Sequence, residues 1–343
     1  MIKVLQYYTD AAPERQSETM RQLRDNYYDL LHIHGCWQKQ AWCLARLALK
    51  QGTRLVISPQ GQLESWVINE KYWLEKLPKK LLYQQCIVKK AYAVIVQGKM
   101  EKECLMRLGW NSRLVIIRNP QITSTITQQE ANKQQETLYR KIMDSNPWEL
   151  MNPQTRHMLR LFIKAGITND KRWIDDDPVT LDANDWRRIL CYAHQEHLTD
   201  IIKHGIRILN FEAPDIDVSQ IPYFLPDGYE EIPTIEQTIG HSFISENERL
   251  LTTFRQLKKL WMQRHLTISH LVELDKELRY HQTDEEGQLR ESLKERGLYK
   301  IAARLMQLMA ELTGLTEGFM LMPPLNDRQT RQMKRQIDNH MKI

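Results

Sequence analysis

The stretch GTRLVISPQGQLESW (residues 52–66) decides the fold of the N-terminal part of the chain. Its aliphatic run Leu55 to Ile57 predicts a short buried strand, which Ser58-Pro59 ends. Gly61 follows at once, so the chain turns beyond the strand. The side chain displayed at this turn is the neutral amide of Gln60, which raises the question of what the turn is built to hold.

Strands and helices alternate on both sides of this stretch. The patterns predict strands at 2–8, 30–33, 54–57, 92–96 and 113–117, and helices at 14–26, 39–50, 70–91 and 99–108. Strands separated by helices of about a dozen residues are typical of right-handed βαβ units, which build a parallel sheet. Residues 1–127 are therefore predicted to form a Rossmann-like α/β domain.

Ligands of parallel sheets bind beyond the carboxyl ends of the strands, where loop amides and helix N-termini converge. This rule selects candidate binding residues in four loops. They are His34, Gly35 and Trp37 after the second strand, Gln60 and Gly61 after the third, Glu101 after the fourth, and Arg118 and Asn119 after the fifth. A glycine after a strand also serves ordinary turn geometry, and a terminal histidine is more often structural than catalytic, so no single loop is decisive.

Four ordered segments carry a family resemblance: DLLHIHGCW, GTRLVISPQGQLESW, AYAVIVQGKMEKECLMRLGW and SRLVIIRNP. Together, over residues 29–120, they resemble the N-terminal, acceptor-side domain of family-four retaining glycosyltransferases of the GT-B fold, as found in bacterial surface-polysaccharide loci. The resemblance implies a nucleotide-sugar-dependent hexosyl transfer to a carbohydrate or lipid-linked acceptor. It also implies that Glu64 and Trp66 line the acceptor cleft with His34, Trp37 and Gln60, and that Trp66 offers an apolar face to a sugar ring.

The chain departs from the family pattern at three places. Relatives usually carry a histidine where this chain has Gln60, and a glutamine cannot carry a proton near neutral pH. Relatives read closer to I-P-N-G where this chain has IIRNP, so Asn119 is kept while Arg118 and Pro120 alter the turn. After the first strand, TDAAPERQSE replaces the glycine-rich loop that relatives carry. We expect sugar recognition to survive these changes and catalysis to weaken, and no catalytic residue is assigned.

Residues 128–343 are predicted to form a mainly helical domain. We expect a helical linker at 128–165, a loop at about 212–240, helices between 246 and 313, and a basic tail at 326–343. A GT-B enzyme needs a second Rossmann domain to hold the nucleotide diphosphate. Only 206–211 and 221–225 read as strands here, and no glycine-rich turn follows them, so binding of a nucleotide sugar is doubtful.

Two spacings in this half suggest sites that other observations disfavour. His194, His197 and His204 would share one face of a helix predicted over 182–204, but His204 lies too far along the helix to share a metal ion with the others. Glu277 and Glu285 have the separation of the family's second-domain glutamates without its small-residue turns. We interpret these patterns as a surface stripe and a coincidence, and we predict neither a metal nor a cofactor.

Two segments near the C-terminus have alternative interpretations. Residues 266–309 could be arranged as a helix-turn-helix, but Glu291 and Glu295 would face the phosphates, so nucleic acid is an unlikely partner. The stripe of Leu305, Met306, Leu308, Met309 and Leu312 is interpreted as core rather than as a groove for a partner.

The composition of the chain limits the classes of protein to which it can belong. The chain has 343 residues, five scattered cysteines and a net charge of +5, and it lacks the run of about 18 apolar residues of a membrane span. The N-terminus has no apolar segment of a signal peptide, so we expect a cytoplasmic protein. Basic runs at 76–80, 89–90 and 328–342 would suit peripheral contact with the inner membrane face.

The sequence thus predicts a glycosyltransferase-like protein related to bacterial surface-polysaccharide biosynthesis, either degenerate or weakly active. The alternative is a non-catalytic binding, scaffold or regulatory protein. In that case the helical domain would assemble with a protein partner or with a second copy of the chain.

Overall fold

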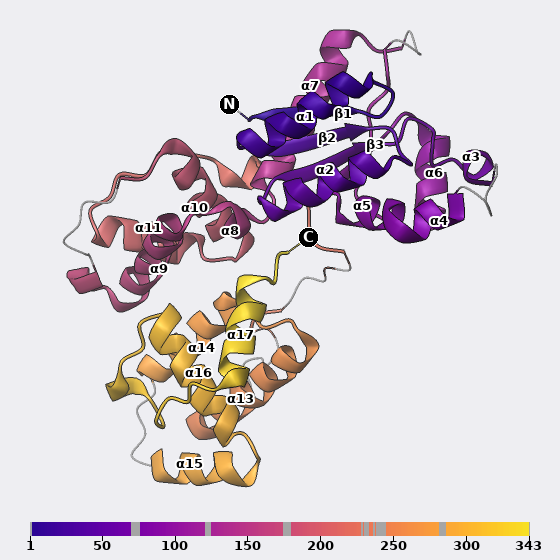
Figure 1. Cartoon of the computed structure of the whole chain (residues 1–343). Coiled ribbons are helices and arrows are strands. Elements are labelled where there is room, and N and C mark those ends of the chain that lie inside the picture. Colours follow the sequence, from indigo (N-terminus) through magenta and orange to yellow (C-terminus); the bar gives the residue numbers. More distant parts are fainter. Residues whose placement is uncertain are drawn as a thin grey trace. The chain divides into compact units, whose positions relative to one another are not determined.

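The computed structural model describes residues 2–69, 76–120, 125–173, 180–227, 229, 233–235, 237, 245–280 and 286–342. The chain divides into two compact units (Figure 1). The first unit is formed by Met1–Ser145 and Pro222–Asp227, and the second by Asn146–Ile221 and Gly228–Lys342.

The first unit is built on a five-stranded parallel sheet. Its strands are β1 (Val4–Tyr8), β2 (Leu30–His34), β3 (Arg54–Ser58), β4 (Ala93–Val96) and β5 (Leu114–Ile116). They pair in the order β1-β2-β3-β4-β5, and every pair is parallel. The predicted Rossmann-like α/β fold is confirmed. Because the strand order follows the chain order, it contains no reversal of the kind at which doubly wound sheets usually bind their ligands.

The helices that connect these strands cover one face of the sheet. They are α1 (Pro13–Asp25), α2 (Lys39–Lys50), α3 (Ser65–Asn69), α4 (Leu77–Lys79), the π-helix η2 (Lys80–Gln84), α5 (Gln85–Lys90) and α6 (Lys99–Leu108). Leu31, Ile33 and Ile57 of the strands pack there against Leu44 of α2 and Val88 of α5. Of the helix expected over 70–91, residues 70–75 lie outside the described part of the chain.

Helix α7 (Gln128–Asp144) packs on the other face of the sheet (Figure 1). Successive strand residues point to opposite faces, so Leu30 and Val56 turn toward Leu138 and Ile142 of α7. The residues expected to begin a linker therefore belong to the sheet unit.

Buried Arg54 holds the end of α7. Its guanidinium donates to the carbonyl of Ser145 at 2.7 Å and to that of Ile142, and it lies 4.4 Å from the centroid of the Tyr92 ring. The last carbonyls of a helix lack partners within the helix, and a cation is favoured there. Arg54 therefore links the first residue of β3 to the C-terminus of α7.

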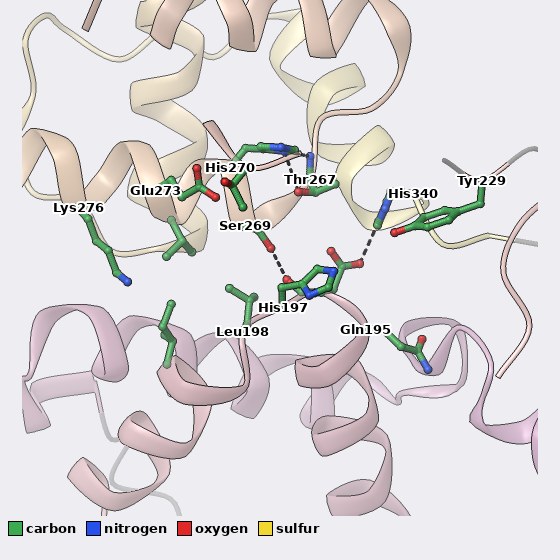
Figure 2. Close-up of a pocket in the computed structure, with 14 residues that line it drawn as sticks. Gln195, His197, Leu198, Tyr229, Thr267, Ser269, His270, Glu273, Lys276 and His340 are labelled. Carbon is green, nitrogen blue, oxygen red and sulfur yellow. Dashed lines mark hydrogen bonds and ion pairs between the residues drawn. The ribbon is translucent and has the colours of Figure 1, made fainter. Parts of the chain in front are cut away.

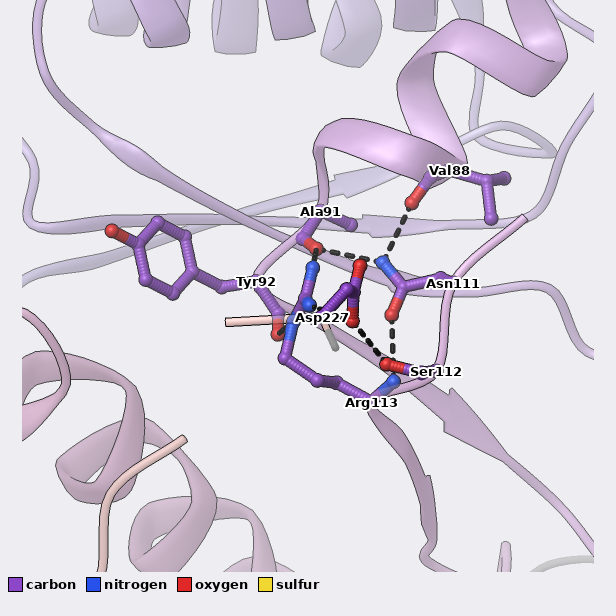
Figure 3. Close-up of polar contacts among 7 residues, drawn as sticks. All are labelled: Val88, Ala91, Tyr92, Asn111, Ser112, Arg113 and Asp227. Atoms are coloured by element: carbon purple, nitrogen blue, oxygen red, sulfur yellow. Dashed lines mark hydrogen bonds and ion pairs between the residues drawn. The ribbon is translucent and has the colours of Figure 1, made fainter. Parts of the chain in front are cut away.

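The segment Pro222–Asp227 returns from the helical part of the sequence to the sheet unit. Phe224 is buried beside α7, its backbone N–H donates to Ser145 Oγ at 2.8 Å, and Lys141 Nζ lies 4.1 Å from its ring centroid. Asp227 accepts a hydrogen bond from Arg113 Nη1 at 2.7 Å (Figure 3). An apolar anchor and an ion pair thus hold this segment on the first unit.

The second unit is helical. Its elements are α8 (Pro147–Leu150), α9 (Pro153–Thr168), η3 (Lys171–Trp173), α10 (Ala183–Gln195), α11 (Thr199–Ile208), η4 (Val218–Gln220), α13 (Glu246–Gln263), α14 (Ile268–Tyr280), α15 (Glu286–Glu295), α16 (Tyr299–Leu312), η5 (Glu317–Phe319) and α17 (Arg328–Asp338). None of its described residues forms a strand. The strand expected at 206–211 is wrong, because α11 covers its first half.

Two glycines bring α9 and α11 into backbone contact. A Cβ built on Gly205 would lie 1.9 Å from Phe162 O, and one on Gly166 would lie 2.1 Å from Ile201 O. Any larger side chain would push the helices apart.

The stripe of α16 is buried at Leu305, Met306, Leu308, Met309 and Leu312. Its interpretation as core is confirmed.

No described helix combines the length and the apolar character that crossing a membrane requires.

Candidate functional site

A cleft of about 400 Å³ opens at the carboxyl ends of the strands, on the sheet face that α7 covers. Its described lining is rich in side-chain amides and contains no Asp or Glu. The amides are those of Gln6, Gln60, Gln97, Asn119, Gln128, Asn132 and Gln135. Each can both donate and accept hydrogen bonds, and all are neutral.

Two histidines of β2 reach this cleft because strand residues two positions apart share a face. The rings of His32 and His34 lie 4.0 Å apart, and the Tyr8 ring stacks on His34 at 4.4 Å between centroids. His34 Nε2 lies 2.7 Å from the amide oxygen of Gln6. That oxygen only accepts, so Nε2 carries the proton. Burial lowers the pKa of His34 to about 4, and the ring is neutral at physiological pH.

Both ring nitrogens of His32 take part in hydrogen bonds. Its Nδ1 lies 2.7 Å from Tyr139 OH, and its Nε2 lies 2.7 Å from Ser58 Oγ. The Tyr139 hydroxyl also accepts hydrogen bonds from Gln6 Nε2 at 3.2 Å and from Gln135 Nε2. Burial, assisted by the neighbouring His34, holds the pKa of His32 well below its usual range. This network is neutral and joins β1, β2 and β3 to α7.

Gln60 stands on a strained turn at the cleft. Its φ is +54°, in the left-handed region, and Gly61 follows with φ +79°. The buried carboxylate of Glu101 accepts from Gly61 N–H and from Gln97 N–H, each at 2.6 Å. Burial raises the pKa of Glu101, while these two hydrogen bonds oppose the rise. Glu101 therefore ties the loop after β3 to the loop after β4, and it does not line the cleft itself.

Gly35 and Trp37 are structural. A Cβ on Gly35, whose φ is +93°, would lie 1.8 Å from Thr9 Oγ1. Trp37 is buried, its N–H donates to Gln84 Oε1 at 2.7 Å, and its carbonyl accepts from Tyr83 OH at 2.8 Å. The expectation that Trp37 lines the cleft is not met, because its loop turns the ring into the core.

Glu64 and Trp66 also lie outside the cleft lining. Trp66 is 70% exposed, and its Nε1 donates to Glu64 Oε2 at 2.7 Å. Arg118 and Asn119 do line the cleft. Arg118 Nη1 donates to Thr125 Oγ1 at 3.0 Å. Of the ten predicted site residues, the cleft thus gathers His34, Gln60, Arg118 and Asn119.

Other cleft residues were missed because they come from β1, β2 and α7 rather than from the selected loops. They include Gln6, Tyr8, His32, Gln128, Asn132 and Gln135. Two signals could have found part of this set. His32 shares the strand face of His34, and Gln128, Asn132 and Gln135 recur at offsets of four and three on one helix face.

A second cavity, of about 220 Å³, lies within the second unit (Figure 2). His340 Nδ1 pairs with buried Glu196 Oε1 at 3.0 Å, and Ser269 Oγ donates to the Glu196 carbonyl. His270 Nδ1 accepts from the backbone N–H of Thr267 at 3.2 Å. These lining groups bond to each other.

The histidines His194, His197 and His204 do not share a helix face. His194 lies in the last turn of α10, and His197, with φ +56°, separates α10 from α11. His204 Nε2 lies 3.2 Å from Asn169 Oδ1. The unbroken helix expected over 182–204 is therefore wrong. The described residues contain no group of three or more His, Cys, Asp or Glu that could hold a metal ion.

The glutamate pair offers no site in the described part of the chain. Glu277 accepts from Arg249 Nε at 3.1 Å and from Thr253 Oγ1 at 3.1 Å. Glu285 lies outside the described residues.

Residues 5–120 match a family model described as "Glycosyl transferase 4-like domain". The match begins in β1 and ends in the loop after β5, and so it covers the sheet and most of the cleft loops. A search of the curated proteins found no match, and neither did a search of the solved structures. The N-terminal region of the chain is a glycosyl transferase 4-like domain.

Proposed function

We propose that the first unit binds a carbohydrate in the cleft between the strand ends and α7, and that the chain has little or no glycosyl transfer activity of its own. One observation carries the proposal: a cleft of about 400 Å³ whose described lining combines neutral amides and neutral imidazoles with no carboxylate.

This lining suits a polyhydroxylated ligand. A side-chain amide can donate to one hydroxyl of a sugar and accept from the next, and the cleft presents such groups from β1, from the loops after β3, β4 and β5, and from α7. Its volume falls in the range of about 300–1,000 Å³ that is common for small-molecule sites. The exposed guanidinium of Arg118 adds a positive rim, which would tolerate an anionic sugar.

The same lining is poor in groups for proton transfer. A base works best when its pKa lies near the working pH, and His34 has a pKa of about 4. Gln60, where relatives carry a histidine, cannot serve as a base. A nucleotide diphosphate is held by helix N-termini that follow strands of a second Rossmann domain, and none of the described residues of the second unit forms a strand from which such a turn could follow. These features support recognition without efficient turnover.

We further propose that the ligand is a carbohydrate or lipid-linked acceptor of bacterial surface-polysaccharide assembly. The location this implies, at the cytoplasmic face of the inner membrane, remains a prediction.

The test is calorimetric titration of the full chain with hexoses, short oligosaccharides and nucleotide sugars. Gln60→Ala and Asn132→Ala are expected to weaken saccharide binding about three- to ten-fold, the size of one lost hydrogen bond. Gln129→Ala is the matched control, because Gln129 is an exposed amide of α7 outside the cleft lining. Absence of saccharide binding, or equal binding by all variants, would overturn the proposal. Clear nucleotide-sugar turnover that Gln60→Ala abolishes would refute the low activity.

A second candidate is assembly through the helical unit. Met262 of α13 and Tyr280 of α14 are large apolar side chains with 72% and 81% of their surface exposed. Sedimentation analysis of the full chain tests this candidate. A concentration-dependent complex that Met262→Gln weakens would support it, and a monomer at all concentrations would exclude self-assembly.

A further inference from the structure

Residues 77–90 form a continuous helical segment with an unusual solvent face. The segment comprises α4, η2 and α5. Its outer side exposes Leu81 by 69% and Leu82 by 72%, and Pro78 and Cys86, four residues before Leu82 and four after it, are exposed too. A surface helix normally turns its apolar side chains inward. Here adjacent leucines face solvent, so burial in this unit does not explain them.

The leucines are held outward by the residues that follow them. Tyr83 and Gln84 are buried, and both hydrogen-bond to the backbone of Trp37. Tyr83 OH donates to the Trp37 carbonyl at 2.8 Å, and Gln84 Oε1 accepts from the Trp37 N–H at 2.7 Å. Two successive contacts to one loop residue fix the rotation of the segment about its axis. Leu81 and Leu82 cannot turn into the core without breaking both.

The charge of the segment is of one sign. Residues 76–90 carry five lysines and no Asp or Glu. Lys76, Lys79 and Lys80 precede the leucines, and Lys89 and Lys90 follow them about two turns later. The ammonium groups of Lys76 and Lys80 lie 4.7 and 5.7 Å from the ring centroids of Trp37 and Trp110. Those two ammonium groups therefore lie over the rings of buried tryptophans, whereas Lys89 and Lys90 are exposed and supply the cations beside the leucine pair.

We propose that this leucine–lysine face, residues 77–90, docks the protein on an anionic lipid bilayer. Leucines enter the boundary between headgroups and acyl chains, while lysine ammonium groups stay among the lipid phosphates. A protein partner fits the face less well, because protein interfaces are depleted of lysine at their centres and need about 800 Å² per partner, far more than two leucines offer. The face stands apart from the saccharide cleft, since no residue of 76–90 lines that cleft.

The experiment is co-sedimentation of the full chain with vesicles of phosphatidylcholine alone and of phosphatidylcholine containing phosphatidylglycerol. The wild type is expected to bind the anionic vesicles, to release them as salt rises, and to ignore neutral vesicles. Leu81→Gln with Leu82→Gln is expected to lower binding by about ten-fold or more. Lys89→Gln with Lys90→Gln is expected to lower it about five-fold for each charge removed.

Matched controls distinguish binding through this face from nonspecific binding by exposed apolar side chains and from an effect of the net charge. Tyr27→Gln removes another exposed apolar side chain of the first unit, and Lys133→Gln with Arg140→Gln removes two exposed cations of α7. These controls are expected to bind like the wild type. Circular dichroism of the leucine variant should be unchanged, because both positions are exposed.

Cys86 supplies an independent readout, since it lies on the same face. An environment-sensitive fluorophore there, with Cys43 and Cys104 replaced by serine, should shift to the blue when anionic vesicles are added. The same label at Lys133→Cys should not shift. The proposal is overturned if the wild type does not bind anionic vesicles, or if the leucine variant binds them equally. It is also overturned if that variant loses only self-association or binding to another protein.

Discussion

The two units of this protein differ in where their polar side chains gather. In the first, His32, His34 and Gln6 gather at the strand ends beside an open cleft. In the second, Asp275 pairs with Arg279 at 2.5 Å, and Arg304 pairs with Asp327 at 2.7 Å, so polar groups join one helix turn or loop to another. A parallel sheet collects polar loops at one edge, whereas a bundle must satisfy each polar group where it lies. The candidate binding site therefore belongs to the sheet.

The largest expected effect of a single substitution is on the helical unit. Gly205→Ala places a methyl group 1.9 Å from Phe162 O, so α9 and α11 must separate. We expect a loss of about 3 kcal/mol or more in the free energy of unfolding, measured by chemical denaturation.

Gly287→Ala is its control, because nothing lies within 4 Å of the added Cβ on that residue of α15. Alanine there should be neutral or stabilise by up to about 1 kcal/mol. Equal stability of the Gly205 variant and the wild type would show that α9 and α11 are not in backbone contact.

The next largest loss of stability is expected in the sheet unit. Arg54→Met removes the guanidinium that donates to the carbonyls of Ser145 and Ile142. We expect a loss of about 2–3 kcal/mol, since hydrogen bonds from charged groups are the stronger ones and the carbonyls stay buried. Saccharide affinity should fall with it, because α7 carries one wall of the cleft.

Denaturation and titration of the same Arg54 variant check both statements. Arg140→Met, at an exposed position of α7, should change neither quantity. A destabilised Arg54 variant with wild-type saccharide affinity would mean that the position of α7 does not shape the cleft.

The central strands β2, β3 and β4 were predictable because they are buried on both faces. A run such as Leu55 to Ile57 has no polar residue to alternate with, and β3 indeed spans Arg54–Ser58 with every residue buried. The consecutive strand order was not predictable, since the same runs fit several orders. The role of α7 was missed for a related reason: Leu138 and Ile142 give an apolar stripe that suits a linker helix as well as a helix packed on a sheet.

The sequence predicted only part of the candidate site. The rule that ligands bind beyond strand ends found His34, Gln60, Arg118 and Asn119. It could not show that Trp37 turns inward, because the direction of a loop side chain depends on local φ and on partners distant in sequence, here Gln84 and Tyr83. The spacing of Gln128, Asn132 and Gln135 marks one face of α7, but only the packing of α7 on the sheet places that face at the cleft.

Acidification should weaken both units through buried neutral histidines. Burial lowers the pKa of His34 in the first unit and of His270 in the second to about 4, from an ordinary value of 6.5. Between these values the unfolded histidine binds a proton that the folded one does not, so stability falls as pH falls through this window. For buried His270 we expect a loss of about 1–2 kcal/mol between pH 7 and pH 5.

Denaturation at the two pH values measures this loss, and His270→Gln should remove its share of the pH dependence. His34 is partly exposed, so solvent should make its share smaller. If stability instead rose on acidification, the assignment of neutral histidines to both units would be wrong.

The smallest effects are expected from removing a helix N-cap. The two units can be compared directly here, because each contains a helix with a reciprocal capping box. Thr127 caps α7 through Glu130, and Asp182 caps α10 through Asp185. Replacing either cap by alanine leaves an N–H of the first turn without its partner and should cost about 1 kcal/mol. Denaturation of both variants checks the values. Only Thr127→Ala should also weaken saccharide binding, since α7 begins at the cleft and α10 does not contribute to its lining. Equal losses of affinity in the two variants would mean that binding depends on the stability of the whole chain, and the assignment of the site to the sheet unit would then fail.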